Sequence, residues 1–171
     1  LPPDEKTSIK DDHQKPVGTP LYGVRFPRWH ICSNSGCQRL FKCGLGAVKI
    51  QKCPDCASRL YQSRFVTVCK NGHIDDFPWQ QWVHRSLSPD CKGSRLKLKS
   101  SGSSSLSGIF INCEDCGKRR PLTGITVMDG EDSFLSKHLE GVEKSPYICR
   151  GHSPWLGDHY ENCDEQMVGI L

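Results

Sequence analysis

The sequence predicts a small, irregular, β-rich α+β fold with a few short helices, in which metal ions replace much of the usual apolar core. The chain has 171 residues, of which only 36% are hydrophobic and eleven are cysteines. Glycine, proline and serine are plentiful and only two alanines occur, which is typical of turns and short strands and not of a helical bundle. Two Cys-x-x-Cys pairs and one Cys-x4-Cys pair predict zinc-ribbon or zinc-knuckle turns.

Zinc ligation explains the cysteines better than disulfide bonds or free thiols do. An odd number of cysteines does not fit a fully paired disulfide framework. Cysteines kept for a metal favour a reducing, cytoplasmic compartment. The sequence contains no signal peptide, lipidation motif or twenty-residue apolar run, so we expect no membrane partner.

The charge of the chain gives no independent sign of nucleic-acid binding. Its formal net charge is +4. Two zinc sites with four thiolates each, and one with two thiolates and two neutral histidines, would cancel that charge. A surface for nucleic acid therefore has to come from local clustering of basic residues.

We expect two regions along the chain. Residues 1–20 are polar, contain four prolines and lack apolar periodicity, which predicts an extended arm or linker. Residues 21–171 should form a single multi-zinc module. Because the chain starts with leucine and ends in VGIL, which reads as the middle of a strand, it is expected to be a fragment of a longer protein.

Short strands are predicted next to the cysteines. The runs QRLF (38–41) and AVKIQK (47–52) flank CGLG and predict a hairpin, and SRFVTVC (63–69) predicts a strand that ends on a cysteine. RLKLK (95–99) and GIFIN (108–112) predict two more strands, joined by a serine-rich loop.

Two short helices are predicted. Asp75 or Asp76 would cap the first, with Pro78 in its first turn. Trp79, Trp82 and Val83 would share its buried face. The second would span residues 132–143 behind an Asp/Ser cap, with Leu135, Leu139 and Val142 at helical spacing.

The spacing of cysteines and histidines predicts three metal sites. The first has the spacing of a four-cysteine ribbon, in which two turns at one end of a hairpin each present two sulfurs and complete a tetrahedral metal site. The second combines the Cys-x3-His motif with the next histidine and cysteine along the chain that could act as ligands. The third has a strong CEDCG half-site, and its other half is assigned by elimination, with His152 and His159 as competing ligands. The predicted groups are Cys32, Cys37, Cys53 and Cys56; Cys69, His73, His84 and Cys91; and Cys113, Cys116, Cys149 and Cys163.

The acidic, aromatic and basic residues outside the predicted metal sites allow less specific interpretations. Asp75 and Asp76 are interpreted as a helix cap and as an acceptor for the second N–H of a ligating imidazole; the alternative is a carboxylate base beside a zinc-bound water. Cys43 is expected to be a buried small residue, and the four tryptophans are expected to be core or lid residues. The best candidate phosphate patch, for which a solvated strand face is the competing explanation, consists of Lys97, Lys99, Lys118, Arg119 and Arg120.

Several motifs resemble a known family. They are RFPRWHIC, CPDC, RFVTVCKNGHIDDFPWQQWVH, INCEDCG and CRGHSPWLG followed by a cysteine. Together they resemble the N-terminal part of the DrmB family, which belongs to the bacterial antiphage system DISARM. The resemblance covers residues 21–171, and CxNGHxDDFPW is its most specific element. By position it also carries over the same twelve cysteines and histidines.

The resemblance implies a cytoplasmic protein without catalysis of its own, acting beside a Snf2-like helicase partner on invading DNA. The preferred hypothesis is thus a zinc-binding scaffold for that helicase and for DNA, with about three structural Zn²⁺ ions and no small-molecule substrate. The alternative is a zinc-dependent nuclease or hydrolase centred on His73, Asp75 and Asp76. A sequence-specific zinc-finger DNA reader ranks last, because no finger-type helix separates the ligand pairs.

Overall fold

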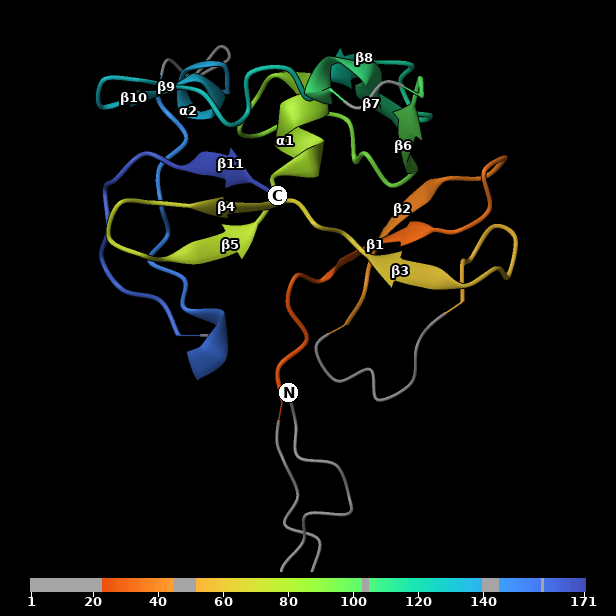
Figure 1. The fold of residues 1–171 in the computed structure, drawn as a ribbon, viewed down its shortest axis with the longest axis horizontal. Coiled ribbons are helices and arrows are strands. Elements are labelled where there is room, and N and C mark those ends of the chain that lie inside the picture. Colours follow the sequence, from red (N-terminus) through yellow and green to blue (C-terminus); the bar gives the residue numbers. More distant parts are fainter. Residues whose placement is uncertain (1–22, 45–51, 103–104, 140–144, 158) are drawn as a thin grey trace, which may run out of the picture.

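The computed structural model describes residues 23–44, 52–102, 105–139, 145–157 and 159–171. The predicted arm at residues 1–20 lies outside these ranges, as does most of the 47–52 strand. Within them, the chain forms antiparallel sheets of six, three and two strands, together with short helices. Figure 1 shows α1 (Trp79–His84) near the centre of the molecule, with the three-stranded sheet and the first three strands of the large sheet on either side below it.

The largest sheet is built from two hairpin-like halves that meet edge to edge. Its strand order is β3-β1-β2-β6-β7-β8, and the two halves join where Leu40 pairs with Leu96. The second half matches the strands predicted on either side of the serine-rich loop. The strands are β1 (Trp29–Cys32), β2 (Arg39–Lys42), β3 (Leu60–Gln62), β6 (Leu96–Ser100), β7 (Ile109–Cys113) and β8 (Arg119–Pro121).

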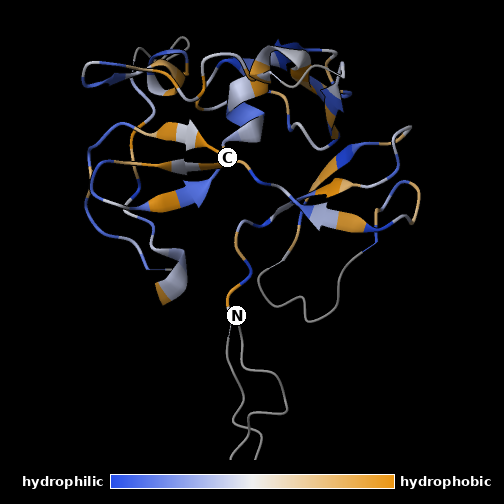
Figure 2. Ribbon diagram, in the orientation of Figure 1, coloured by the Kyte–Doolittle hydropathy of each residue, from blue (hydrophilic) through white to orange (hydrophobic). Residues whose placement is uncertain are grey.

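The three-stranded sheet joins distant parts of the chain. β4 (Val66–Val68) is the strand predicted before Cys69, and it lies between β5 (Ile74–Asp76) and β11 (Val168–Ile170). The VGI run pairs antiparallel with the VTV run. In Figure 2, β5 changes from hydrophobic to hydrophilic along its length, because it ends in two aspartates. This sheet brings the C-terminal segment back to the centre of the chain.

The apolar core is organised around the aromatic side chains at α1. Trp79 and Trp82 are 0% and 1% exposed, and both contact the ring of Phe77. The Trp82 indole N–H donates to the carbonyl oxygen of Pro121 at 3.0 Å, which ties α1 to β8. The predicted buried face of this helix is therefore confirmed.

The predicted cap of α1 is wrong. Asp75 and Asp76 belong to β5, and Pro78 occupies the N-cap position without any side-chain cap. The reason is strand pairing: the backbone of Asp75 pairs with Thr67, and that of Asp76 pairs with Val66. The aspartates therefore precede the helix as part of a sheet.

The second helix begins where the sequence predicts. Ser133 accepts a hydrogen bond from the backbone N–H of Ser136 and caps α2 (Phe134–Lys137), which is shorter than expected. Leu135 and Leu139 are fully buried, whereas Val142 lies outside the described residues. The remaining elements are β9 (Met128–Asp129), β10 (Asp132–Ser133) and the single-turn helices η2 (Leu106–Gly108) and η4 (Pro154–Leu156). Among the described residues, no helix has the length and apolar character that crossing a membrane requires.

Candidate metal centres

The twelve predicted cysteine and histidine side chains come together in three groups of four. Within each group, the candidate ligand atoms all lie within 4.8 Å of one another. The groups are Cys32, Cys37, Cys53 and Cys56 (first cluster); Cys69, His73, Cys149 and Cys163 (second cluster); and His84, Cys91, Cys113 and Cys116 (third cluster). Each cluster therefore offers four protein ligands to one ion.

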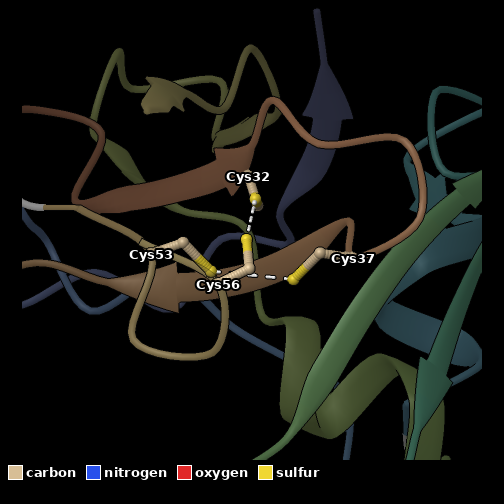
Figure 3. Close-up of side chains that lie close together, drawn as sticks. All are labelled: Cys32, Cys37, Cys53 and Cys56. Atoms are coloured by element: carbon tan, nitrogen blue, oxygen red, sulfur yellow. Dashed lines mark hydrogen bonds between the residues drawn. The ribbon is translucent and has the colours of Figure 1, made fainter. Parts of the chain in front are cut away.

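The first cluster has the membership that its spacing predicts, and its geometry fits a metal (Figure 3). The Sγ atoms of Cys32 and Cys56 lie 3.4 Å apart, and those of Cys37 and Cys53 lie 3.7 Å apart. A tetrahedral site with Zn–S bonds of about 2.3 Å has an edge of roughly 3.8 Å. A disulfide would need about 2.0 Å, and all four cysteines are free thiols. The donor set therefore suits zinc.

The predicted grouping of the second and third sites is wrong. Cys69 and His73 share their cluster with Cys149 and Cys163, not with His84 and Cys91. The cause is the C-terminal strand: β11 pairs with β4, and the N–H of Cys149 donates to the carbonyl of Glu165 at 2.7 Å. These contacts bring the last two cysteines to the turn between β4 and β5.

The third cluster joins α1 to the large sheet. His84 ends α1 and Cys113 ends β7, two elements that pack against each other. The Sγ atoms of Cys91 and Cys113 lie 3.7 Å apart, and Cys116 Sγ lies 3.3 Å from His84 Nε2. Both separations fit a mixed sulfur and nitrogen site.

The regrouping leaves the total charge unchanged. A zinc ion with four thiolates has two net negative charges, and one with three thiolates and a neutral imidazole has one. One site of the first kind and two of the second kind have the same total as the predicted set. The formal charge of +4 would still be cancelled.

Both cluster histidines present one ring nitrogen to sulfur and the other to a second partner. His84 Nδ1–H donates to the Gln80 carbonyl at 2.6 Å, which leaves Nε2 for the cluster. His73 Nδ1 lies 3.5 Å from Cys69 Sγ, while its Nε2 lies 3.6 Å from a carboxylate oxygen of Glu161. Such partners orient a ligating imidazole. The aspartates therefore do not take the role predicted for them: the Gln80 carbonyl accepts from His84, and the Glu161 carboxylate lies beside His73.

Sequence reasoning missed both of these partners. Gln80 lies one helical turn before His84, so an i−4 carbonyl contact was a usable signal. Glu161 is distant from His73 in the sequence, and only the fold brings the two side chains close together.

Each cluster contains a tight turn of the same type. The N–H of Gly72, Ala57 or Gly117 donates to the carbonyl of the cysteine three or four residues earlier. The three donors have φ values of +83°, +57° and +76°, in the left-handed region that glycine adopts most easily. Two of the three positions are glycine for this reason.

Burial makes several of the thiols poor acids. It raises the pKa of Cys32 and of Cys149 to about 12 and that of Cys113 to about 11. By contrast, the hydroxyl and N–H of Ser58 lower the pKa of exposed Cys56 to about 6. A metal ion that binds these thiols near neutral pH must therefore displace protons from the buried ones.

The two aspartates make ion pairs that do not include His73. Asp75 accepts two hydrogen bonds from Arg150, at 3.0 and 2.5 Å, and lies 3.4 Å from His152 Nδ1. Asp76 accepts from the backbone N–H of Arg28 at 2.8 Å, and its carboxylate lies 3.8 Å from Lys42 Nζ. These contacts are those of structural carboxylates, and they give no support to a carboxylate base beside a metal-bound water.

The predicted basic patch is divided between two faces of the large sheet. Lys97, Lys99 and Arg119 share the outer face, since Lys97 pairs with Asn112 and Asn112 with Arg119. Lys97 forms an ion pair with Glu114 at 2.6 Å. Arg120 points to the opposite face and is only 5% exposed. Arg120 is therefore not part of the patch.

Other predicted roles are also visible in the structure. Cys43 is buried, at 3% exposure, and belongs to none of the three clusters. Trp79 and Trp82 are core residues, while Trp155 is 62% exposed and does not fit the core or lid role. The competing ligands His152 and His159 are outside the clusters.

Comparison with known proteins agrees with the family resemblance of the motifs. The family described as a domain of unknown function (DUF8724) matches residues 1–171. The chain belongs to this DUF8724 family. It is also 36% identical, over 157 residues and 88% of its length, to the DISARM protein DrmB of Bacillus paralicheniformis. The predicted similarity to DrmB is thereby confirmed.

The match covers only part of DrmB. The chain spans about a quarter of the length of this relative, because the aligned region is 25% of the DrmB sequence. The three clusters lie between residues 32 and 163, so a match over 88% of the chain includes most of the region that contains them.

Proposed function

We propose that this chain is a non-catalytic, zinc-stabilised scaffold module of a DISARM-type antiphage defence protein. In this role it works in the cytoplasm beside a Snf2-like helicase and helps that helicase engage invading DNA. The support is the similarity to DrmB together with three clusters that each offer four ligands. Four protein ligands around one zinc leave no position for water or substrate, which is the arrangement of a structural site.

Each cluster fastens elements that the small core alone would hold weakly. The first joins the start of the β1–β2 connection to the turn before β3. The second joins the β4–β5 turn to the C-terminal segment, and the third joins α1 to β7. Three ions in these places would make a rigid surface for a partner from a chain rich in loops.

The outer face of β6, β7 and β8 is the surface we propose for DNA. Lys99 and Arg119 are exposed there, and Arg119 stacks on the Phe110 ring at 3.9 Å. Exposed cations beside an aromatic ring suit contact with a nucleic-acid backbone and bases. Lys97 contributes less, because Glu114 neutralises it.

Reversing the two exposed charges should weaken binding to DNA. We expect Lys99→Glu with Arg119→Glu to lower the affinity of the metal-loaded chain for single-stranded DNA and to reduce its salt dependence, with a slope smaller by about one per contact. Fluorescence anisotropy at several salt concentrations measures both quantities, and a pull-down with the purified Snf2-like helicase measures partner binding.

Arg64→Glu is the matched control, since Arg64 is exposed in the turn between β3 and β4. If the double variant binds DNA like the control, this face is not the DNA surface. If the unmodified chain retains no helicase, the scaffold role fails even where DNA binding persists.

A further inference from the structure

A second basic site lies on the other side of the large sheet. A cleft with a volume of about 510 Å³ opens beside α1 and α2, and it is lined by Trp82, Arg85, Arg120, Thr123, Phe134 and His138. This volume is in the range of ligand pockets. The lining combines two guanidinium groups, a hydroxyl and aromatic rings, with no carboxylate among the described residues that line it.

Arg120 is held rigidly with part of its hydrogen-bonding capacity unused. Its guanidinium stacks on the Trp82 ring at 3.3 Å, and Nη1 donates to the carbonyls of Trp82 at 2.9 Å and His138 at 3.4 Å. A guanidinium has five N–H donors. Among the described residues, no acceptor lies within hydrogen-bonding distance of Nε or Nη2, and neither of these two nitrogens is fully shielded from solvent. These donors therefore reach solvent in the cleft.

The cleft concentrates positive charge without a counter-ion. Within the described ranges, neither Arg85 nor Arg120 forms an ion pair. Burial, together with the nearby charge of Arg85, lowers the pKa of Arg120 to about 10, so that it stays protonated at neutral pH. Arg120 is a buried cation, and a buried cation beside a second cation is unfavourable until an anion joins them.

We propose that this cleft binds a phosphate group between Arg85 and Arg120, with the Thr123 hydroxyl as a further donor. A planar guanidinium fixed by stacking matches the oxygens of phosphate in a bidentate manner. The phosphate belongs either to a nucleic-acid backbone or to a free nucleotide. The site is on the opposite face from Lys99 and Arg119, and it requires neither a helicase partner nor DNA contact at the outer face.

The test is a titration of the metal-loaded chain with inorganic phosphate, AMP and a short single-stranded oligonucleotide. NMR signals of Thr123 and His138 report occupancy of the cleft and give the dissociation constant. We expect Arg85→Gln to weaken binding by roughly tenfold, the ratio that one charge-assisted hydrogen bond provides. Arg85 is exposed, so the variant should keep the fold.

A matched variant sharpens the result. Arg64→Gln removes the same charge at an exposed residue outside the cleft lining and should bind like the unmodified chain. If only the oligonucleotide binds, the phosphate belongs to a nucleic-acid backbone. If AMP binds as well and Arg85→Gln weakens its binding by the same factor, the phosphate belongs to a nucleotide. The proposal is overturned if no probe shifts the two signals, or if Arg85→Gln and Arg64→Gln bind alike.

Discussion

Cys53→Ser will unfold the metal-loaded chain, whereas Cys43→Ser will leave it folded. Both side chains are 3% exposed, and both substitutions replace sulfur by oxygen. Only Cys53 belongs to a cluster. A structural zinc contributes roughly 10–16 kcal/mol of apparent binding free energy in small peptides, while a whole domain is stable by only about 5–15 kcal/mol. Weakening one site therefore removes most of the net stability.

Thermal unfolding followed by circular dichroism, with and without a chelator, measures this difference. The unmodified chain and Cys43→Ser should melt cooperatively and lose that transition when the metal is chelated. Cys53→Ser should lack the transition from the start. Equal melting curves for the two variants would mean that the first cluster does not support the fold.

Gly151→Ala should disrupt the second cluster. Gly151 has a φ of +67°, and a Cβ added there would collide with the backbone carbonyl of Glu161. The N–H of Glu161 also donates to the Gly151 carbonyl at 3.0 Å, so the two sides of this loop are in direct contact. Separating them moves Cys149 away from Cys163, and the expected cost is at least about 4 kcal/mol, an exceptional value for one substitution.

Gly117→Ala is the control for Gly151→Ala. Its φ is +76°, but an added Cβ would meet no atom within 4 Å, so only the backbone cost of about 1–2 kcal/mol is expected. Chemical denaturation gives both free energies of unfolding, and elemental analysis of Gly151→Ala should find one metal ion fewer than in the unmodified chain. Similar costs for the two variants would show that the Gly151 loop does not organise the second cluster.

The sequence predicted those parts of the fold that depend on local contacts. The four ligands of the first cluster lie within residues 32–56, at the ends of neighbouring strands, so their spacing sufficed. The same holds for the buried face of α1 and for the Ser133 cap of α2. In these places, short-range geometry and the structure agree.

Contacts between distant segments could not be predicted in this way. The predicted second site combined Cys69 and His73 with the next ligands along the chain. Spacing alone does not reveal that Val66–Val68 pairs with Val168–Ile170. Asp75 and Asp76 resemble a helix cap only until β5 is known to pair with β4. Arg120 resembles its neighbour Arg119 until strand alternation separates their faces.

Cadmium NMR of the cadmium-substituted chain tests most directly whether three closed clusters hold this fold, because chemical shift separates sites by their sulfur and nitrogen ligands. The predicted and observed groupings both divide ten sulfurs and two nitrogens among three sites, so the average number of sulfur and nitrogen ligands per site cannot distinguish them. We predict three resonances, one from a four-sulfur site and two from sites with three sulfurs and one nitrogen. Fewer than three resonances, or a site with two sulfurs and two nitrogens, would contradict the account.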